Sequence, residues 1–345
     1  MILIDVIKSN YIASPALIKQ KIVQLSFIQS WKPSMRFFVE RLGLIISENI
    51  QTGAGKNING PCCIEVPSWC VGHLSKSYLY FADHAGSHIK LAYADKISGP
   101  WTLCKGEVLD LAAFTDAYDH VASPDIFIDY AKNEVRLYFH ARSHERAREQ
   151  WTFAATSSDG LNFRPATDEP LAPFYLKLFL WDGKFYGMSK GGNLWCSSDG
   201  LSPFKPGGNP FNRSLSAEFW HNQPGSIRHV GLHLEEDTLV VYFSRIGDAP
   251  ERIFRNRIDL KPDWKDWTAS ALEEVLRPEF DYEGANLPVT ISTCGAASQP
   301  ENALRDPHVL LYMNEKYLFY SVCGEQGIAV SRLYENNCMR TPSKG

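Results

Sequence analysis

The sequence predicts an all-β protein, a five-bladed β-propeller with an N-terminal extension. Five short aromatic strands recur along the chain, and their third residues stand at positions 80, 138, 186, 242 and 319, so that the spacings are 58, 48, 56 and 77 residues. A repeat of roughly 50 residues built of short strands is typical of β-propellers. The turn Ser-Ser-Asp-Gly also occurs twice, at 157–160 and 197–200, which supports a true repeat. The aromatic strands are Tyr78–Phe81, Arg136–Phe139, Lys184–Gly187, Val240–Phe243 and Tyr317–Tyr320.

Residues 1–58 lie outside the repeat and form the predicted extension. Ser14-Pro15 is typical of a helix start, because Pro suits the first helical position, and apolar residues continue at helical spacing to about Trp31. Residues 41–47 read as a strand. We expect the extension to pack on the propeller or to complete its last blade. The propeller is predicted over 59–334, and 335–345 is expected to be a tail.

Each blade is predicted to begin with a strand that lines the central channel. These first strands begin at Asn59, at His120, near Tyr175, at Ser226 and at Asn302. The interval before the fifth blade is the longest, because it holds residues 279–303, which are rich in Gly, Pro, Ser and Asn. We expect this segment to be a loop over one face of the propeller, where long loops are often functional.

The composition excludes several classes of function. With 44% hydrophobic and 21% charged residues, the 345-residue chain has enough apolar material for a folded core. A net charge of −4 with no block of like charge lacks the basic footprint of a nucleic-acid-binding protein. No run of about 18 apolar residues and no ordinary signal peptide are present. We therefore expect a cytoplasmic protein without nucleic-acid or membrane partners.

The cysteines do not indicate a cofactor. Eight are scattered along the chain, and Cys62, Cys63 and Cys70 are followed by no second pair at zinc-ligand spacing. We expect most of them to be buried thiols. A metal ion in the channel is conceivable because His and Asp residues converge there, but no spacing requires one, and we expect no cofactor.

The phase of the repeat predicts which residues share one end of the channel. In a propeller blade, the first strand and the second run in opposite directions, so the start of the first strand and the turn after the second lie at the same end. Both sets are rich in His, Arg and carboxylates, which predicts a polar pocket there. The strand starts supply Asn59, His120, Ser123, Asp125, Arg228, His229, Arg305, Asp306 and His308. The turns supply Asp83, His84, His140, Arg142, Arg245, Asp248 and Glu325.

Simpler interpretations of these residues stay open. Asp125 and Asp306 adjoin prolines and would also suit turn caps. Single His residues are more often structural than catalytic, and Arg245 and Asp248 would also suit a surface pair. The occurrence of these residues together at one end of the channel is therefore stronger evidence for a site than any single residue.

Several segments carry a resemblance to a known group. They are the Asp306-Pro307 strand start with the following residues to Ser321, the segment Ile89–Trp101, and the turn 157–163. Together with the five-fold repeat they resemble the five-bladed β-propeller glycoside hydrolases, a clan that includes arabinanases, xylosidases, levansucrases and invertases. The resemblance covers about 59–334. It implies a hydrolase of carbohydrates with one Asp as base or nucleophile, a second Asp that orients, and a Glu as acid.

The chain departs from that pattern at three strand starts. Asn59-Gly60-Pro61 stands where the resemblance implies Asp before Pro, the second blade has Ser123-Pro124, and 172–178 in the third contains no carboxylate. Three explanations stay open. The site is rebuilt with Asp125, Asp306 and Glu325, with a His such as His120 or His229 as proton donor. Or the missing acid comes from Glu65 or from the carboxylates of the long loop (Glu279, Asp281 and Glu283). Or the chain binds a sugar without cutting it.

The preferred interpretation is a glycosidase that acts on a carbohydrate at the mouth of the channel. Asp125 and Asp306 would share the base and orienting roles, and Glu325 or a His of the rim would donate the proton. The predicted substrate-binding residues are His84, His120, His140, Arg142, Arg228, His229, Arg245, Asp248 and Arg305. The alternative is a non-catalytic carbohydrate-binding propeller. A protein-interaction propeller would favour an apolar rim instead.

Overall fold

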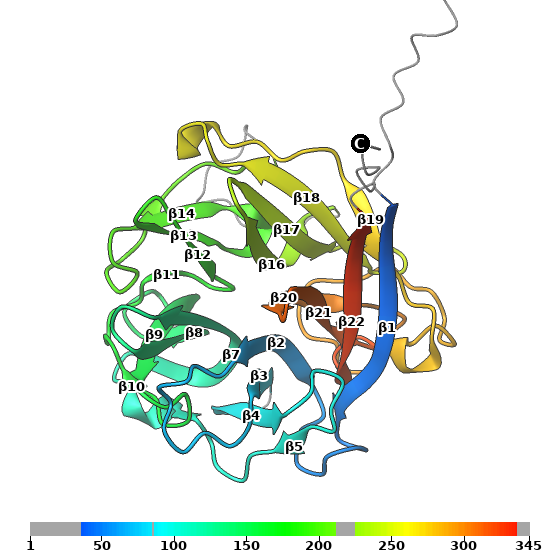
Figure 1. Cartoon of the computed structure of the whole chain (residues 1–345), viewed down its shortest axis with the longest axis horizontal. Helices are drawn as coiled ribbons and strands as arrows, with labels where there is room; N and C mark the ends of the chain where they lie inside the picture. Colours follow the sequence, from blue (N-terminus) through cyan, green and yellow to red (C-terminus); the bar gives the residue numbers. More distant parts are fainter. Residues whose placement is uncertain (1–35, 85, 212–224, 337–345) are drawn as a thin grey trace, which may run out of the picture. The chain divides into compact units, whose positions relative to one another are not determined.

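The computed structural model describes residues 36–84, 86–211 and 225–336, and five antiparallel sheets are arranged around a central channel. Figure 1 shows this ring, with one strand of each sheet nearest the centre. The predicted all-β class and the five-bladed propeller are thereby confirmed. The helix expected after Ser14 lies outside the described residues. The innermost strands are β2 (Ile58–Glu65), β7 (Ala117–Asp129), β12 (Lys177–Trp181), β16 (Ile227–Glu235) and β20 (Arg305–Tyr312).

The first two blades each carry an additional short strand. The first blade continues with β3 (Ser77–Asp83), β4 (His88–Ala94) and β5 (Thr102–Leu103), and β6 (Leu109–Asp110) also pairs with β4. The second continues with β8 (Glu134–Ser143), β9 (Gln150–Ser157) and β10 (Arg164–Pro165), and β11 (Ala172–Pro173) also pairs with β9. A single 3₁₀ turn, η1 (Leu111–Ala113), separates the two blades.

The next two blades have four strands each. The third continues with β13 (Lys184–Met188), the turn η2 (Lys190–Gly192), β14 (Leu194–Ser197) and β15 (Lys205–Pro206). The fourth continues with β17 (Thr238–Arg245), β18 (Ile253–Asp259), η3 (Trp264–Asp266) and β19 (Glu273–Leu276). The turn η4 (Asp281–Glu283) then begins the long connection to the fifth blade.

The fifth blade is assembled from both ends of the propeller. After β20 come β21 (Glu315–Val322) and β22 (Gly327–Asn336), and the fourth strand is β1 (Arg36–Ser47), which pairs with β22. Ile45 and Ile46 of β1 are buried against residues of β2, β3 and β21. The strand that precedes the first blade therefore also contributes to the core between the fifth blade and the first.

The recurring motifs form equivalent contacts between neighbouring blades. The Tyr80 hydroxyl of the first blade donates to the carbonyl of Gly160 in the second at 2.7 Å, and Tyr138 of the second donates to Gly200 in the third at 3.0 Å. Asp159 and Asp199 accept the backbone N–H groups of the two residues that follow each Gly. Each Ser-Ser-Asp-Gly turn is thus fixed by its own side chains and joined to the blade before it.

Bulges in the innermost strands turn selected residues toward the channel. The pairing register slips between Asn59 and Cys62, between Ala122 and Asp125, between Ile227 and Val230, and between Arg305 and His308. An extra residue in one strand bends it and re-aims its side chains. Three residues inside these bulges have a positive φ: Gly60 (59°), Ser123 (50°) and Asp306 (49°). In the third blade, Tyr175 just before β12 has a φ of 61°.

Within residues 36–84, 86–211 and 225–336, no helix has the length and apolarity needed to cross a membrane.

Candidate active site

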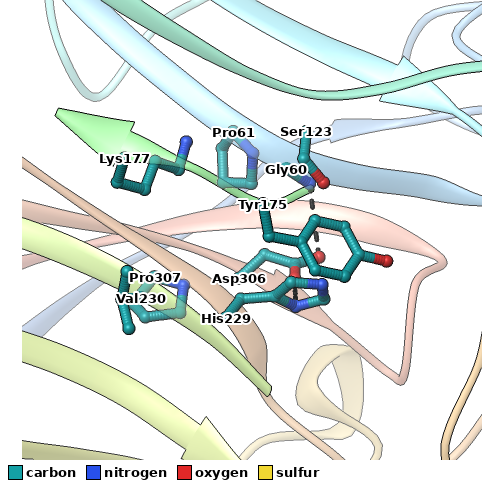
Figure 2. Close-up of a pocket in the computed structure, with 9 residues that line it drawn as sticks. All are labelled: Gly60, Pro61, Ser123, Tyr175, Lys177, His229, Val230, Asp306 and Pro307. Carbon is teal, nitrogen blue, oxygen red and sulfur yellow. Dashed lines mark hydrogen bonds and ion pairs between the residues drawn. The ribbon is translucent and has the colours of Figure 1, made fainter. Parts of the chain in front are cut away.

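Five residues, one from each blade, line a single narrow cavity in the channel. They are Gly60, Ser123, Tyr175, His229 and Asp306, and we call them the channel ring. Figure 2 shows this ring together with Pro61, Lys177, Val230 and Pro307. The cavity has room for about one water molecule. A larger ligand would therefore bind above the ring, at the mouth of the channel.

Asp306 is the best-coordinated carboxylate of the ring. One oxygen accepts the Gly60 N–H at 3.2 Å, and the other pairs with His229 Nδ1 (Figure 2). The first oxygen also accepts the Ser321 hydroxyl at 3.0 Å. Burial alone would raise the pKa of Asp306. The hydrogen bonds that Asp306 accepts from His229, Gly60 and Ser321 instead hold that pKa below its ordinary value. Asp306 is therefore an ionised carboxylate.

His229 is oriented as a base. Burial lowers the pKa of His229, although the neighbouring Asp306 opposes this. With Nδ1 directed to Asp306, the other nitrogen, Nε2, is buried and has no hydrogen-bond partner among the described residues. A neutral imidazole that donates from Nδ1 to a carboxylate keeps a free lone pair on Nε2. His229 can thus accept a proton from a molecule in the cavity.

Glu325 and His84 form a second pair at the same mouth. His84 Nδ1 lies 3.1 Å from Glu325 Oε2 and also contacts Asn57 Oδ1, and Glu325 Oε2 accepts the backbone N–H of Ala297 at 3.1 Å. Burial works to lower the pKa of His84. Glu325 and Asp306 outweigh it, so the pKa of His84 is raised. His84 therefore favours the charged form that can donate a proton.

The two pairs are close enough to influence each other. Burial raises the pKa of Glu325 and His84 lowers it to below its ordinary value, while the charge of Asp306 acts to raise it. The charge of Asp306 also contributes to the raised pKa of His84. The structure thus brings Asp306, His229, Glu325 and His84 together, as the phase of the repeat predicts.

Tyr175 joins His229 to two further histidines. Its ring centroid lies 4.0 Å from that of His229 and 4.5 Å from that of His140, and the rings of His140 and His120 are 5.5 Å apart. His140 is 1% exposed, and neither of its ring nitrogens has a hydrogen-bond partner within the described part of the chain. Burial lowers the pKa of His140, and the charges of neighbouring histidines and Lys190 add to this. His140 is a neutral polar group available to a ligand.

Arg228 and Arg305 lie behind the mouth and not in the cavity. Both are buried, and their Nε atoms donate to the two oxygens of Glu251 at 2.7 and 2.8 Å. Arg228 also donates to the carbonyls of Thr293 and Gly295, and Arg305 Nη1 lies 3.5 Å from Glu325. These contacts fix the long loop and Glu325. Glu251, which sequence reasoning did not nominate, joins the two arginines.

Asp125 is separated from the other candidate carboxylates. Its oxygens contact the Leu178 N–H at 2.8 Å and Lys177 Nζ at 3.4 Å, and it lines a second cavity with His308 and Glu65. Lys177 borders both cavities. Burial raises the pKa of Asp125 despite Lys177. Sequence reasoning placed Asp125 and His308 at the mouth because it counted residues without the bulges.

One group of side chains beside the second cavity has donor atoms at the spacing of a cation site. Donor atoms of Cys62, Asp125 and His308 all lie within 4.8 Å of one another. The Lys177 ammonium, however, already pairs with Asp125 and donates to the Pro124 carbonyl at 2.7 Å. A second cation beside this ammonium would be repelled. Lys177 therefore already neutralises the Asp125 carboxylate that a metal ion would need.

The remaining candidates lie at the edge of the mouth or away from it. Arg245 and Asp248 form a two-bond pair at 3.2 and 2.9 Å, and the exposed Arg142 pairs with Asp119 at 3.0 Å. Glu283 is fully buried and accepts the Tyr320 hydroxyl and two backbone N–H groups. It therefore stabilises η4 and is not available as the missing acid.

Sequence reasoning missed Tyr175 and Lys190. Tyr175 lies two residues before β12, in the segment where the resemblance implies a carboxylate and the sequence contains none. Lys190 lies in the turn after β13, the position that supplied His84 and Glu325 in other blades. Applying the same rule to the third blade would have nominated Lys190.

The fold is that of the five-bladed β-propeller glycoside hydrolases. A thermostable family-43 glycoside hydrolase superposes with a TM-score of 0.56 at 16% identity, covering 86% of this chain and 98% of the other. An endo-arabinase from Bacteroides thetaiotaomicron gives 0.58 at 11% identity, covering 86% and 99%. A Xanthomonas citri enzyme in complex with xylotriose gives 0.54 at 12% identity, covering 86% and 89%. The chain is thus a divergent example of this architecture.

A viral protein is much closer in sequence. Over 297 residues, 80% of this chain and 83% of the other, the chain is 39% identical to the protein named Uncharacterized protein R118 of Acanthamoeba polyphaga mimivirus. The chain belongs to the family of that protein. No family model matches the chain.

Proposed function

We propose that the protein is a glycoside hydrolase that acts on a carbohydrate bound at the mouth of the channel. One observation carries this proposal: two His–carboxylate pairs share the mouth, and their environments move the two histidine pKa values in opposite directions. Titratable groups whose pKa values are pushed apart are the usual acid and base of a hydrolytic site. The family-43 fold supports a carbohydrate as the substrate.

The roles of the four residues follow from that difference. His229 Nε2 takes a proton from a water in the channel-ring cavity, and that water attacks the anomeric carbon. His84, charged at its raised pKa, donates a proton to the leaving oxygen. Asp306 and Glu325 act as positioning residues, because each holds its histidine in the required orientation. Asp125 has no role in this scheme, because it lies in the second cavity.

This assignment is tested with matched substrates that differ in leaving group. A 4-nitrophenyl glycoside needs little help from an acid, whereas the corresponding disaccharide needs a proton on its leaving oxygen. We expect His229→Gln to lose about 10²- to 10⁴-fold in kcat on both substrates. His84→Gln should lose a similar factor on the disaccharide and much less on the nitrophenyl glycoside. Equal losses of the two variants on both substrates would contradict the assignment of acid and base.

A non-catalytic carbohydrate-binding propeller is the second candidate. It is favoured by Gly60 and Ser123, which stand where the resemblance implies carboxylates, and by the lowered pKa values of both mouth carboxylates. Ordinary glycosidases use a carboxylic acid as the proton donor. Binding of a sugar without turnover of any glycoside in a broad panel would favour this candidate over hydrolysis.

A further inference from the structure

Lys190 is a buried amine near the mouth of the channel, and no carboxylate of the described residues pairs with it. Burial lowers the pKa of Lys190, so an anion beside it would favour its charged form. The residue is 6% exposed, and among the described residues its ammonium makes no ion pair. Within the described part of the chain, its side-chain hydrogen bond is to Cys294 Sγ at 3.5 Å, and a thiol sulfur is a weak acceptor. Buried charges are normally paired, because removing them from water is costly. Among residues 36–84, 86–211 and 225–336, Lys190 therefore has no anionic partner.

Lys190 belongs to the same group of side chains as the candidate acid and base. Its ammonium lies 5.3 Å from the ring centroid of Phe174 and 6.0 Å from that of Tyr175. Tyr175 contacts His229 on one side and His140 on another. Lys190 and the Asp306–His229 pair are thus joined by a single aromatic side chain, a span that one sugar residue could bridge.

Two further features prepare this position for an anion. The unpartnered ring nitrogens of His140, next to Tyr175, offer a hydrogen-bond donor. The loop that carries Cys294 is fixed on both sides, because Arg228 donates to the carbonyls of Thr293 and Gly295. The ammonium is consequently held in place before a ligand arrives, and little ordering is needed on binding.

We infer that the mouth recognises an acidic sugar, whose carboxylate pairs with Lys190 and accepts a hydrogen bond from His140. This inference rests on the proposed function only for the assumption that the ligand is a carbohydrate. In a pyranose uronate the carboxylate is attached to C5, which is joined to the anomeric carbon through the ring oxygen. With that group at Lys190, the anomeric carbon is free to lie toward His229 and Asp306.

Binding of monosaccharides to the full-length chain tests this without any hydrolysis. The probes are D-glucuronate and D-galacturonate, their neutral counterparts D-glucose and D-galactose, and sulfate and acetate at equal ionic strength, measured by calorimetry or ligand-observed NMR. We expect at least one uronate to bind about 10- to 100-fold more tightly than its neutral counterpart, as for a hydrogen-bonded charge pair. Absence of uronate binding, or equal binding of the neutral sugar, would overturn the inference.

The inorganic and small anions separate a sugar-acid site from a general oxyanion site. Sulfate and acetate should bind at least about 10-fold more weakly than the preferred uronate, because they lack the ring contacts. Equal binding of either anion would overturn the assignment to an acidic sugar. Because Lys190 is almost fully buried, salt should screen this pair only weakly, and the preference of the wild type for the uronate should persist as salt is added.

Variants locate the recognition at Lys190. Lys190→Gln should remove the preference for the uronate, whereas the matched control Lys184→Gln, an exposed lysine at the other end of β13, should keep it. If Lys190→Gln does not fold, the preference of the wild type for the uronate over the neutral sugar, sulfate and acetate still decides whether the inference holds. Cys294→Ser should change uronate binding by less than about 3-fold. A gain of about 10-fold would mean that a Cys294 thiolate already neutralises Lys190, which overturns the inference.

The two proposals fail separately. If uronates bind with this preference and no glycoside is turned over, hydrolysis fails and the anion site stands. If neutral glycosides are turned over and no uronate is preferred, the anion site fails and hydrolysis stands.

Discussion

At the scale of single residues, the site depends on which atom of each histidine is free. His229 uses Nδ1 for Asp306 and leaves Nε2 without a partner among the described residues, while His84 uses Nδ1 for Glu325 and keeps a raised pKa. In the proposed mechanism, the same pair of residue types therefore supplies a base in one case and an acid in the other. The two histidine pKa values differ because the surroundings differ. His229 is the more deeply buried of the two, whereas the charges of both Glu325 and Asp306 raise the pKa of His84.

Asp306→Asn tests this electrostatic arrangement through the pH dependence of kcat. The charge of Asp306 raises the pKa of both His229 and His84, so its removal should lower both. Activity needs neutral His229 and charged His84, and it therefore rises with pH through the first pKa and falls through the second. Both limbs should move to lower pH, together with a loss of about 10²-fold or more in kcat. Asp248→Asn, which removes a carboxylate of the Arg245 pair, should leave both limbs in place.

A purely structural role for Asp306 would lower activity without moving the limbs. The acidic limb is the more informative one, because His229 is in direct contact with Asp306. If that limb stays at its wild-type pH in Asp306→Asn, then Asp306 does not act through His229.

At the scale of elements, the bulges of the innermost strands decide which residues meet. Asp125 and Asp306 both adjoin a proline, yet Asp306 lies inside its bulge with a positive φ, and Asp125 lies just beyond its own. In the second blade the bulge residue is Ser123. The two aspartates therefore enter different cavities, although they look equivalent in the sequence.

A substitution at Gly60 tests whether the bulge of the first blade can accept a side chain. This is the strand start at which the resemblance implies a carboxylate. A Cβ at Gly60 would lie 2.8 Å from the Cα of Ser123, so a side chain there requires the backbone of the next blade to move. We expect Gly60→Ala to lower the free energy of unfolding by about 3 kcal/mol, part from the positive φ of 59° and part from the collision. Denaturant titration measures this.

Gly183→Ala is the matched control for that variant. Gly183 has a φ of 70°, and a Cβ added there would meet no atom within 4 Å, so its substitution reports the cost of the backbone conformation alone, about 1–2 kcal/mol. If the two variants are equally stable, Gly60 is not required by the contact with Ser123. The same collision implies that Gly60→Asp does not restore an ordinary carboxylate at this position.

Sequence reasoning could predict the repeat, because the features that mark it are local. The aromatic strands and the Ser-Ser-Asp-Gly turns bond to each other across blades, as Tyr80 does to Gly160. The rim was predictable in outline, because strand direction alone assigns Glu325 and His84 to one end. The bulges could not be predicted, because they depend on how neighbouring strands pair. They place Asp125 outside the site. The role of Glu251 could not be predicted either, because this single carboxylate accepts hydrogen bonds from Arg228 and Arg305, which lie in distant segments of the chain.

At the scale of the propeller, the junction between the first and fifth blades joins distant parts of the chain. β1 pairs with β22, and its Ile46 is fully buried in a cluster with Phe81 of the first blade and Phe319 of the fifth. The backbone also approaches closely here, because a Cβ at Gly327 would lie 2.6 Å from the Ile46 carbonyl oxygen. Loss of packing at this junction should therefore weaken the ring as a whole rather than one blade.

Ile46→Ala tests that closure. Removing a fully buried isoleucine side chain should lower the free energy of unfolding by about 2–5 kcal/mol. Because each blade packs against its neighbours around the ring, tryptophan fluorescence and far-UV circular dichroism should still report one coincident transition, shifted to lower denaturant. Phe38→Ala, at a position of β1 that is 48% exposed, should shift the midpoint much less. Two separate transitions in Ile46→Ala would mean that the blades unfold independently and that β1 does not couple the fifth blade to the first.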